Sequence, residues 1–317
     1  MYWLFSIISV WVFHFFISPW VDPYFFTILM FTGINIILAA SLNLVNGFTG
    51  QFSLGHAGFM SMGAYASAMI TVTARNFFPE MMATPVFSTL LFLLSLGVGG
   101  TLAALAGYGV GLPSLRLKGD YLAVVTLGFG EIIRVVFLNI DFVGGARGLP
   151  DIPYLSTFGW IYTVVILTLF IIWRTLHSSQ GRAFLAVRED EIAAEAMGVH
   201  VTSAKVRTFV MGAFFAGIAG GLFAHYLRYL NPAIFDFNRS FEVVIMVVLG
   251  GMGSLTGSVV AAILLTFSRE GLRFLQEFTQ IDLRMVIYSL LLILMMIVRP
   301  KGLFGSQEWT TFFRKKR

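Results

Sequence analysis

The sequence predicts an all-α protein embedded in a membrane, a polytopic helical bundle of about ten spans with short or re-entrant glycine-rich segments. Hydrophobic residues make up 57% of its 317 residues and charged residues only 12%, whereas soluble domains average roughly 45–50% and about 25%. So little charge leaves too little polar surface to face water on all sides. Because apolar runs and short loops fill nearly the whole chain, we expect residues 1–317 to form a single transmembrane domain.

Apolar stretches of about 20 residues, the length that crosses a bilayer, follow one another along the chain. We expect spans near residues 3–20, 24–45, 56–73, 86–112, 121–139, 155–174, 205–228, 240–251, 254–274 and 283–299. The eighth is the shortest and runs into Gly250-Gly251-Met252-Gly253. It is a short span, a half-helix that returns, or the first half of a helix broken before the next segment. Because irregular backbone at membrane depth needs protein or a water-filled cavity around it, Gly250 and Gly251 are candidates for a solute pathway.

Basic residues indicate the orientation, because Lys and Arg are enriched in cytoplasmic loops. The chain ends in Arg314-Lys315-Lys316-Arg317. Ten spans place both termini in the cytoplasm together with this basic tail, residues 300–317, whereas nine would place the tail outside. The first apolar stretch lacks the basic start and cleavage site of a signal peptide, so we expect it to be retained. The net charge of +5 therefore indicates topology, and we expect contact with the lipid bilayer and not with nucleic acid.

Polar residues crowd the join between the second and third spans. The group consists of Asn43, Asn46, Thr49, Gln51, Ser53 and His56, interleaved with glycines. Unpaired polar groups beside hydrocarbon are costly, so these side chains need partners. Either the segment lines a solute pathway or it is a connecting loop at the level of the lipid headgroups. The spacing leaves both interpretations open.

Charged residues inside the spans are few. Glu131 and Arg134, three residues apart in the fifth span, share a helix face and can pair. Such residues often mark function, although a structural ion pair near the membrane surface is the alternative. The chain has no cysteine, no phosphate-binding loop, and no spacing typical of a metal or nucleophile–base site. The sequence therefore predicts a transport protein and not an enzyme, without cofactor or metal, and any ATP hydrolysis is expected on another chain.

The longest polar stretch is the predicted cytoplasmic loop at about residues 177–205. Within it, Ile192, Ala193, Ala196 and Met197 form a small apolar stripe at helical spacing, and Gly198 suits a helix end. We predict a helix over residues 188–198 that docks in a groove of a partner. Contact with lipid is the alternative, but the acidic residues of the stretch argue against it because the cytoplasmic leaflet is anionic.

Four stretches carry a resemblance to a known family. They are NGFTGQFSLGHAGFMSMGAY (46–65), LRLKGDYLAVVTLGFGEIIR (115–134), GRAFLAVREDEIAAEAMGV (181–199) and VVLGGMGSLTGSVVAA (247–262). In this order they resemble the permease subunits of bacterial branched-chain amino acid ABC importers. The second stretch favours the LivM-type over the LivH-type subunit.

The resemblance implies four kinds of partner or setting: a second, related LivH-type permease subunit, two ATP-binding subunits, an extracytoplasmic substrate-binding protein, and the bacterial inner membrane. It implies that the helix from residue 188 to 198 couples transport to the ATPases. The residues it assigns to coupling are Gly181, Arg182, Arg188, Glu189, Asp190, Ala193, Ala196 and Gly198. Relatives that carry urea or other small amides and amino acids are similar, so the substrate stays open. A stand-alone secondary transporter is a further alternative, with Glu131 as its acidic candidate.

The mechanism implied is alternating access, in which solute crosses between two permease chains. We expect the pathway at Asn43, Asn46, Gln51, Ser53, His56, Glu131, Gly250 and Gly251. We find no pattern in the sequence that places an acid and a base around one cavity. We therefore expect the permease to have little affinity of its own and the binding protein to supply selectivity.

Overall fold

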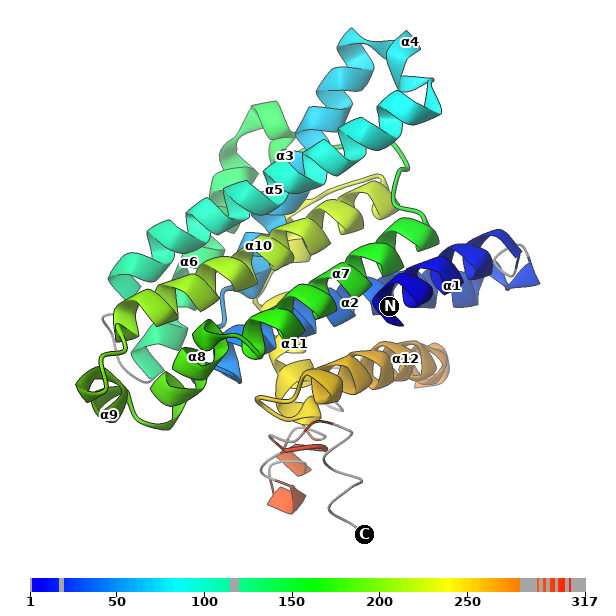
Figure 1. The fold of residues 1–317 in the computed structure, drawn as a ribbon. Helices are drawn as coiled ribbons and strands as arrows, with labels where there is room; N and C mark the ends of the chain where they lie inside the picture. Colours follow the sequence, from blue (N-terminus) through cyan, green and yellow to red (C-terminus); the bar gives the residue numbers. More distant parts are fainter. Residues whose placement is uncertain are drawn as a thin grey trace.

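A computed structural model of the chain describes residues 2–16, 20–114 and 120–279, and after these 290, 293–294, 297–299, 302–305 and 308. In these ranges the regular elements are helices, with one isolated β-bridge between Leu149 and Leu230 (Figure 1). The α-helices are α1 Tyr2–Phe16, α2 Pro23–Asn46, α3 His56–Phe77, α4 Pro79–Met82, α5 Pro85–Ser114, α6 Asp120–Asn139, α7 Phe158–Leu176, α8 Ser179–Glu189, α9 Glu191–Ala196, α10 Val201–Leu227, α11 Phe237–Gly250 and α12 Leu255–Thr279. Short 3₁₀ turns are η2 Asp141–Val143, η3 Gly145–Arg147 and η4 Pro232–Phe235.

The helices confirm the all-helical prediction, and their length and composition are consistent with a polytopic membrane bundle. Each of the first nine predicted spans coincides with a helix whose ends differ by a few residues. Among the described residues, five helices are long and apolar enough to cross a membrane, namely α2, α5, α6, α7 and α10. The tenth predicted span, 283–299, lies mostly outside the described residues, as does most of the tail. The count of ten therefore stays a prediction.

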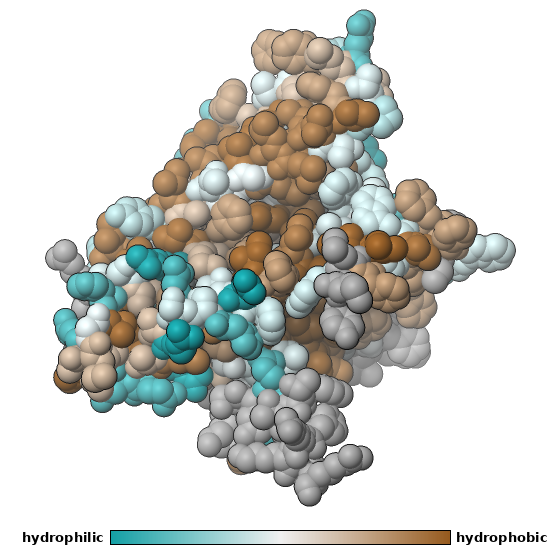
Figure 2. Space-filling model, viewed as in Figure 1, coloured by the Kyte–Doolittle hydropathy of each residue, from teal (hydrophilic) through white to brown (hydrophobic). Residues whose placement is uncertain are grey.

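The bundle is built around α2 and α10, which are mostly buried, whereas α5, α6 and α7 expose much of their apolar surface. Hydrophobic side chains accordingly cover the flank of the molecule formed by the long helices (Figure 2). A helix that is apolar on its outer face as well as its inner one suits contact with lipid. Polar side chains gather on α8 and α9 at one end.

Glycines allow the central helices to approach closely. Gly63 of α3 faces Gly217 of α10, where a Cβ atom would overlap the backbone. Gly99 of α5 approaches the same place, with the Gly63 carbonyl oxygen 2.7 Å from the position of a Cβ. Helices in lipid gain dispersion contact from such approaches, because meeting another helix buries no surface from water.

The short helix α11 turns back along α12. Gly250 packs against Gly257 at the turn, and Glu242 forms an ion pair with Arg269 further along both helices. The two helices are therefore antiparallel, and the interpretation as one broken helix is wrong. With 14 residues, α11 is about 21 Å long, shorter than the hydrocarbon core of roughly 30 Å.

The two ends of the bundle differ. We call the end that carries α8 and α9 the α8–α9 end. The start of α1 lies there, since Trp3 packs on Trp173 in the last turn of α7. Residues 302–305 and 308 lie at the same end, where the Leu303 amide donates to the Leu249 carbonyl (2.9 Å) and Glu308 accepts from the Leu255 amide (2.9 Å). The described ends of the chain thus lie on one side.

Candidate functional site

The segment predicted as one helix over residues 188–198 is two helices, so that prediction is wrong in detail. The chain breaks at Asp190, whose backbone is extended (φ −160°). The Asp190 carboxylate accepts from the amides of Ile192 (2.8 Å) and Ala193 (3.0 Å) and caps α9. Asp is among the preferred N-cap residues, which explains why a new helix begins there. Gly198, with a φ of +84°, follows the end of α9 as predicted.

The apolar stripe of this segment faces outward. Ile192 is 77% and Met197 84% exposed, and Ala193 and Ala196 are exposed beside them. Ala194 instead packs on the body of the protein. The stripe is therefore available to a partner, inside the hydrophilic region at the α8–α9 end (Figure 2).

Three contacts fasten α8 and α9 to the bundle. Gly181 lies so close to the backbone of Leu176 that a Cβ would overlap it, while Arg182 next to it is exposed. The Lys205 ammonium pairs with the Glu191 carboxylate at 2.5 Å. Arg188, 3.6 Å from exposed Glu189, donates from Nη1 to the Gly47 carbonyl at the end of α2 (3.0 Å).

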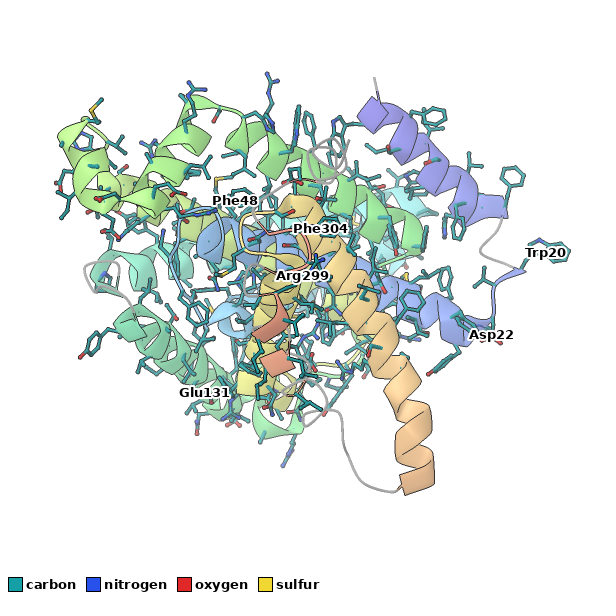
Figure 3. All side chains as sticks on the ribbon, turned by 90° about the horizontal axis from the view of Figure 1, so that it is seen from below. Trp20, Asp22, Phe48, Glu131, Arg299 and Phe304 are labelled. Carbon is teal, nitrogen blue, oxygen red and sulfur yellow. The ribbon has the colours of Figure 1, made fainter. Side chains whose placement is uncertain are left out.

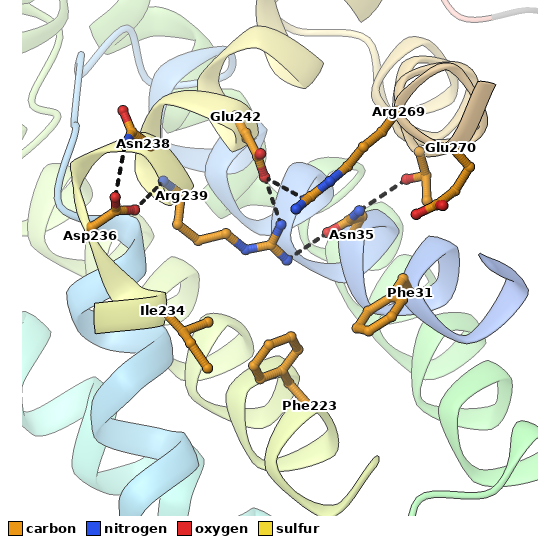
Figure 4. A pocket seen from close by; sticks show the side chains of 11 residues that line it. Phe31, Asn35, Phe223, Ile234, Asp236, Asn238, Arg239, Glu242, Arg269 and Glu270 are labelled. Carbon is orange, nitrogen blue, oxygen red and sulfur yellow. Dashed lines mark hydrogen bonds and ion pairs between the residues drawn. The ribbon is translucent and has the colours of Figure 1, made fainter. Parts of the chain in front are cut away.

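A cavity of about 590 Å³ lies between α2, α10, α11 and α12 (Figure 4). It is lined by both apolar and charged side chains. The lining residues are Phe31, Asn35, Phe223, Ile234, Asp236, Asn238, Arg239, Glu242, Thr266, Arg269 and Glu270. Because Asn35 is near the middle of α2, the cavity lies about half-way along the bundle, where α11 begins.

An ionic network forms one wall of the cavity. Arg239, only 9% exposed, donates from Nη1 to Glu242 (2.9 Å) and from Nη2 to Asn35 (2.8 Å). Arg269 donates to the same Glu242 oxygen at 3.2 Å. The Nε of Arg239 is buried and has no hydrogen-bond partner in the described part of the chain. The ring of Phe223 lies beneath this guanidinium, 5.9 Å from its Cζ.

Comparison with known proteins identifies the chain. A family model described as branched-chain amino acid transport system / permease component matches residues 24–296. The chain belongs to this family. It is 38% identical over 307 residues to the high-affinity branched-chain amino acid transport system permease protein LivM of Escherichia coli K12, covering 86% of this chain and 68% of that protein.

More distant relatives include both subunit types. The probable LivM of Methanocaldococcus jannaschii is 26% identical over 334 residues, 92% of this chain and 96% of the relative. The permease protein LivH of E. coli K12 is 26% identical over 314 residues, 88% of this chain and 95% of LivH. No solved structure matches the permease.

The predicted pathway residues of this permease fall into three groups, none of which lines the cavity. Asn43, Gly250 and Gly251 meet at the α8–α9 end of the contact between α2, α11 and α12. The Asn43 amide donates to Ser254 O (2.8 Å) and Ser258 Oγ (2.7 Å) and accepts from the Gly253 amide (2.9 Å). Asn43 is thus fully paired and joins the end of α2 to the turn between α11 and α12.

The second group holds the 47–55 segment in place. The Asn46 side-chain oxygen accepts from the Ser53 amide (3.1 Å), and the Gln51 amide donates to the Lys205 carbonyl (3.3 Å). His56 bonds through Nε2 to the Ser41 hydroxyl of α2 at 2.8 Å. All four side chains are buried. Each of these residues hydrogen-bonds within the protein, although the buried Gln51 Oε1 has no partner in the described part of the chain. The segment packs into the bundle.

Glu131 forms the third group. It pairs with Arg134 at 2.7 Å, as predicted, and its side chain is 33% exposed. Figure 3 places Glu131 at the edge of the bundle.

The charged cavity was not predicted from the sequence, so the expectation that no acid and base share a cavity is wrong. Arg239 and Glu242, three residues apart, lie in the first half of the short glycine-terminated helix α11. Ionisable residues in a span too short to cross a membrane were the available signal. Glu242 lies inside the predicted eighth span, residues 240–251, but only Glu131 and Arg134 were weighed as charged residues of the spans.

Proposed function

We propose that this chain is the membrane-spanning permease subunit of an ABC importer for branched-chain amino acids. A binding protein delivers the solute, and the permease passes it across by alternating access. The observation that carries the proposal is the exposed stripe of α9, tied to the bundle through Arg188 and Lys205, in a member of this permease family. The names of the E. coli and M. jannaschii relatives support the substrate class.

The proposed assembly contains a second, LivH-type permease, two ATP-binding subunits and an extracytoplasmic substrate-binding protein, in the bacterial inner membrane. Similarity to both LivM and LivH supports a pair of related permeases. We place the α8–α9 end in the cytoplasm, so residues 177–205 face the ATPases. The start of α1 and residues 302–305 and 308 share that end. This supports an even number of spans, cytoplasmic termini and a cytoplasmic tail, residues 300–317.

The contacts suggest how movement reaches the pathway. Arg188 contacts Gly47 after α2 and lies against Gly253 in the turn between α11 and α12. Asn43 joins these same two places. When an ATPase moves α8 and α9, Arg188 pulls on the contact that closes the α8–α9 end. Opening this contact connects the cavity to the cytoplasm. Opening and closing of this contact requires that α2 pack against α12 in two distinct arrangements.

A charge on the α9 stripe tests the coupling role. Ala196→Arg places a guanidinium on the exposed stripe and should prevent ATPase docking without disturbing the bundle. Ala83→Arg, at an exposed position between α4 and α5, is the matched control. We expect the ATPases to co-purify with the control and to be lost, together with uptake, in Ala196→Arg.

Two outcomes contradict the proposal. One is an Ala196→Arg complex that retains its ATPases and transports normally. The other is accumulation of solute by the purified chain alone in vesicles that have only an ion gradient, which would identify a secondary transporter.

A further inference from the structure

We infer that the cavity between α2, α10, α11 and α12 binds the solute in transit and selects an α-amino acid zwitterion with an aliphatic side chain, with Arg239 and Arg269 holding its carboxylate. This inference rests on the proposed function and deepens it, because it assigns selectivity to the permease itself.

Charges of both signs face the same space. The lining contains the guanidiniums of Arg239 and Arg269 and the carboxylates of Asp236, Glu242 and Glu270. A zwitterion can contact both signs across a distance of a few ångströms. A fatty acid or an alkylamine offers one charge and would leave the other unpaired in a buried site, which is costly. Urea has no net charge at either end and gains least from such a wall.

Arg239 has donor capacity to spare. Two of its nitrogens are engaged by Glu242 and Asn35, but its buried Nε–H has no acceptor in the part of the chain that is described. More than nine in ten buried polar groups in proteins are paired, so an unpaired one invites an explanation. A carboxylate entering the cavity meets the guanidinium of Arg239, which lines it, and guanidinium is the group best matched to a carboxylate in shape.

Glu242 indicates how a carboxylate is accepted here. One of its oxygens takes hydrogen bonds from both arginines, at 2.9 and 3.2 Å (Figure 4). Glu242 neutralises the two arginines. A solute carboxylate would share the two guanidiniums with Glu242. Its ammonium group would be balanced by the charges of Asp236, which caps α11, and Glu270, which accepts from the Tyr24 hydroxyl.

The cavity also has apolar lining. Phe31, Phe223 and Ile234 lie beside the ionic network in Figure 4, with Phe223 beneath the Arg239 guanidinium. A separate small pocket that shares Asn35, Glu242 and Arg269 with the cavity is lined by Ile245, Met246 and Leu265. The volume of about 590 Å³ falls within the roughly 300–1,000 Å³ of small-molecule sites. Each methylene that the solute buries here should raise affinity about fourfold.

The position in the fold supports a transport site. The cavity lies at the start of α11, a helix too short to span, near the middle of α2. Transporters place solutes near the bilayer midplane at the ends of discontinuous helices, because polar backbone is tolerated there. Eight residues further along α2, about 12 Å, Asn43 closes the path to the α8–α9 end.

The test measures equilibrium binding of radiolabelled leucine to the complete transporter in nanodiscs without the binding protein. We expect competition by isoleucine and valine, but not by 4-methylpentanoate, 3-methylbutylamine or urea. Arg239→Gln should weaken leucine binding tenfold to a hundredfold, as is typical when a charged hydrogen bond is lost. Arg134→Gln is the matched control, because Arg134 also pairs with a glutamate three residues away but lies outside the cavity.

Arg269→Gln provides a second test of the site in case the Arg239 variant misfolds. Arg269 is 42% exposed in its side chain, so its replacement should leave the fold intact and weaken binding severalfold. Wild-type affinity in both assembled variants overturns the assignment, as does the absence of leucine binding to the wild-type complex at millimolar leucine. If the wild-type transporter supplied with its binding protein imports no branched-chain amino acid, the proposed function itself fails. If the wild-type transporter imports leucine normally and both variants bind leucine with wild-type affinity, only the assignment of the site is refuted.

Discussion

Asn43 joins the end of α2 to the turn between α11 and α12, and its replacement should open that contact. Its side chain is fully buried and makes three hydrogen bonds, to Ser254 O, Ser258 Oγ and the Gly253 amide. Interhelical hydrogen bonds in a membrane protein contribute about 0.6 kcal/mol each on average, which gives roughly 2 kcal/mol for three. Leaving the Gly253 amide without an acceptor adds about 1 kcal/mol or more.

We therefore expect Asn43→Leu, which changes side-chain volume little, to lower the free energy of unfolding by about 3 kcal/mol. SDS titration of the purified protein in mixed micelles measures it. Asn139→Leu is the control, because Asn139 is exposed and its amide bonds only to the Val135 carbonyl one turn away (2.7 Å). The free energy of unfolding of Asn139→Leu should fall by no more than about 0.5 kcal/mol.

The same variant should raise basal ATP hydrolysis, since the closed contact no longer holds the α8–α9 end. A loss for Asn43→Leu no larger than that for Asn139→Leu would refute the reasoning. In that case water or lipid would satisfy the same polar groups in the unfolded state as well as Asn43 does in the folded state. The contact would then not act as a gate.

Three further substitutions test the packing, the coupling and the polar segment. Gly63→Ala should destabilise the protein by about 1–3 kcal/mol through overlap with a facing helix, whereas Gly97→Ala, which meets nothing within 4 Å, should change stability by less than 1 kcal/mol; equal melting temperatures would contradict this. Arg188→Ala removes the bond to Gly47 and should lower solute moved per ATP hydrolysed, with an unchanged ratio counting against it. His56→Ala should lower thermal stability but not uptake per assembled complex; lost uptake in a stable complex would instead favour the pathway role predicted from sequence.

Periodicity and composition predicted the elements well, because the bilayer imposes length and hydrophobicity on each span. The helices agree with the first nine predicted spans, and the Glu131–Arg134 pair follows from helix geometry alone. The break at Asp190 was less accessible. The stripe from Ile192 to Met197 has helical spacing, but a capping aspartate can interrupt a helix without disturbing that spacing. Asp190 can either continue the helix or cap a new one, and packing in the folded protein decides between one helix and two.

The candidate site depended on contacts between residues distant in sequence. Arg239 meets Asn35 across 204 positions, and Arg269 meets Glu242 across 27. Nothing local to any of these residues predicts that they share a cavity. The polar 43–56 segment misled for the opposite reason. Its residues look unusual as a group, yet they hydrogen-bond inside the bundle, as His56 does with Ser41, and only the Gln51 Oε1 is buried without a partner among their described side-chain atoms.

The cost of the ionic wall argues for its function. Burying charged groups carries a desolvation penalty of several kcal/mol per ion, and well-packed apolar residues in their place are often equally or more stable. Arg239 and Glu242, whose side chains are 10% and 15% exposed, bear this penalty with little compensation from water. The network also leaves the buried Arg239 Nε without an acceptor in the described structure, so its own hydrogen bonds do not offset the whole penalty. A permease whose binding protein alone chose the solute would need only an inert path. Charges of both signs beside apolar side chains, with Asn43 between them and the α8–α9 end, are what a second selection step inside the membrane requires.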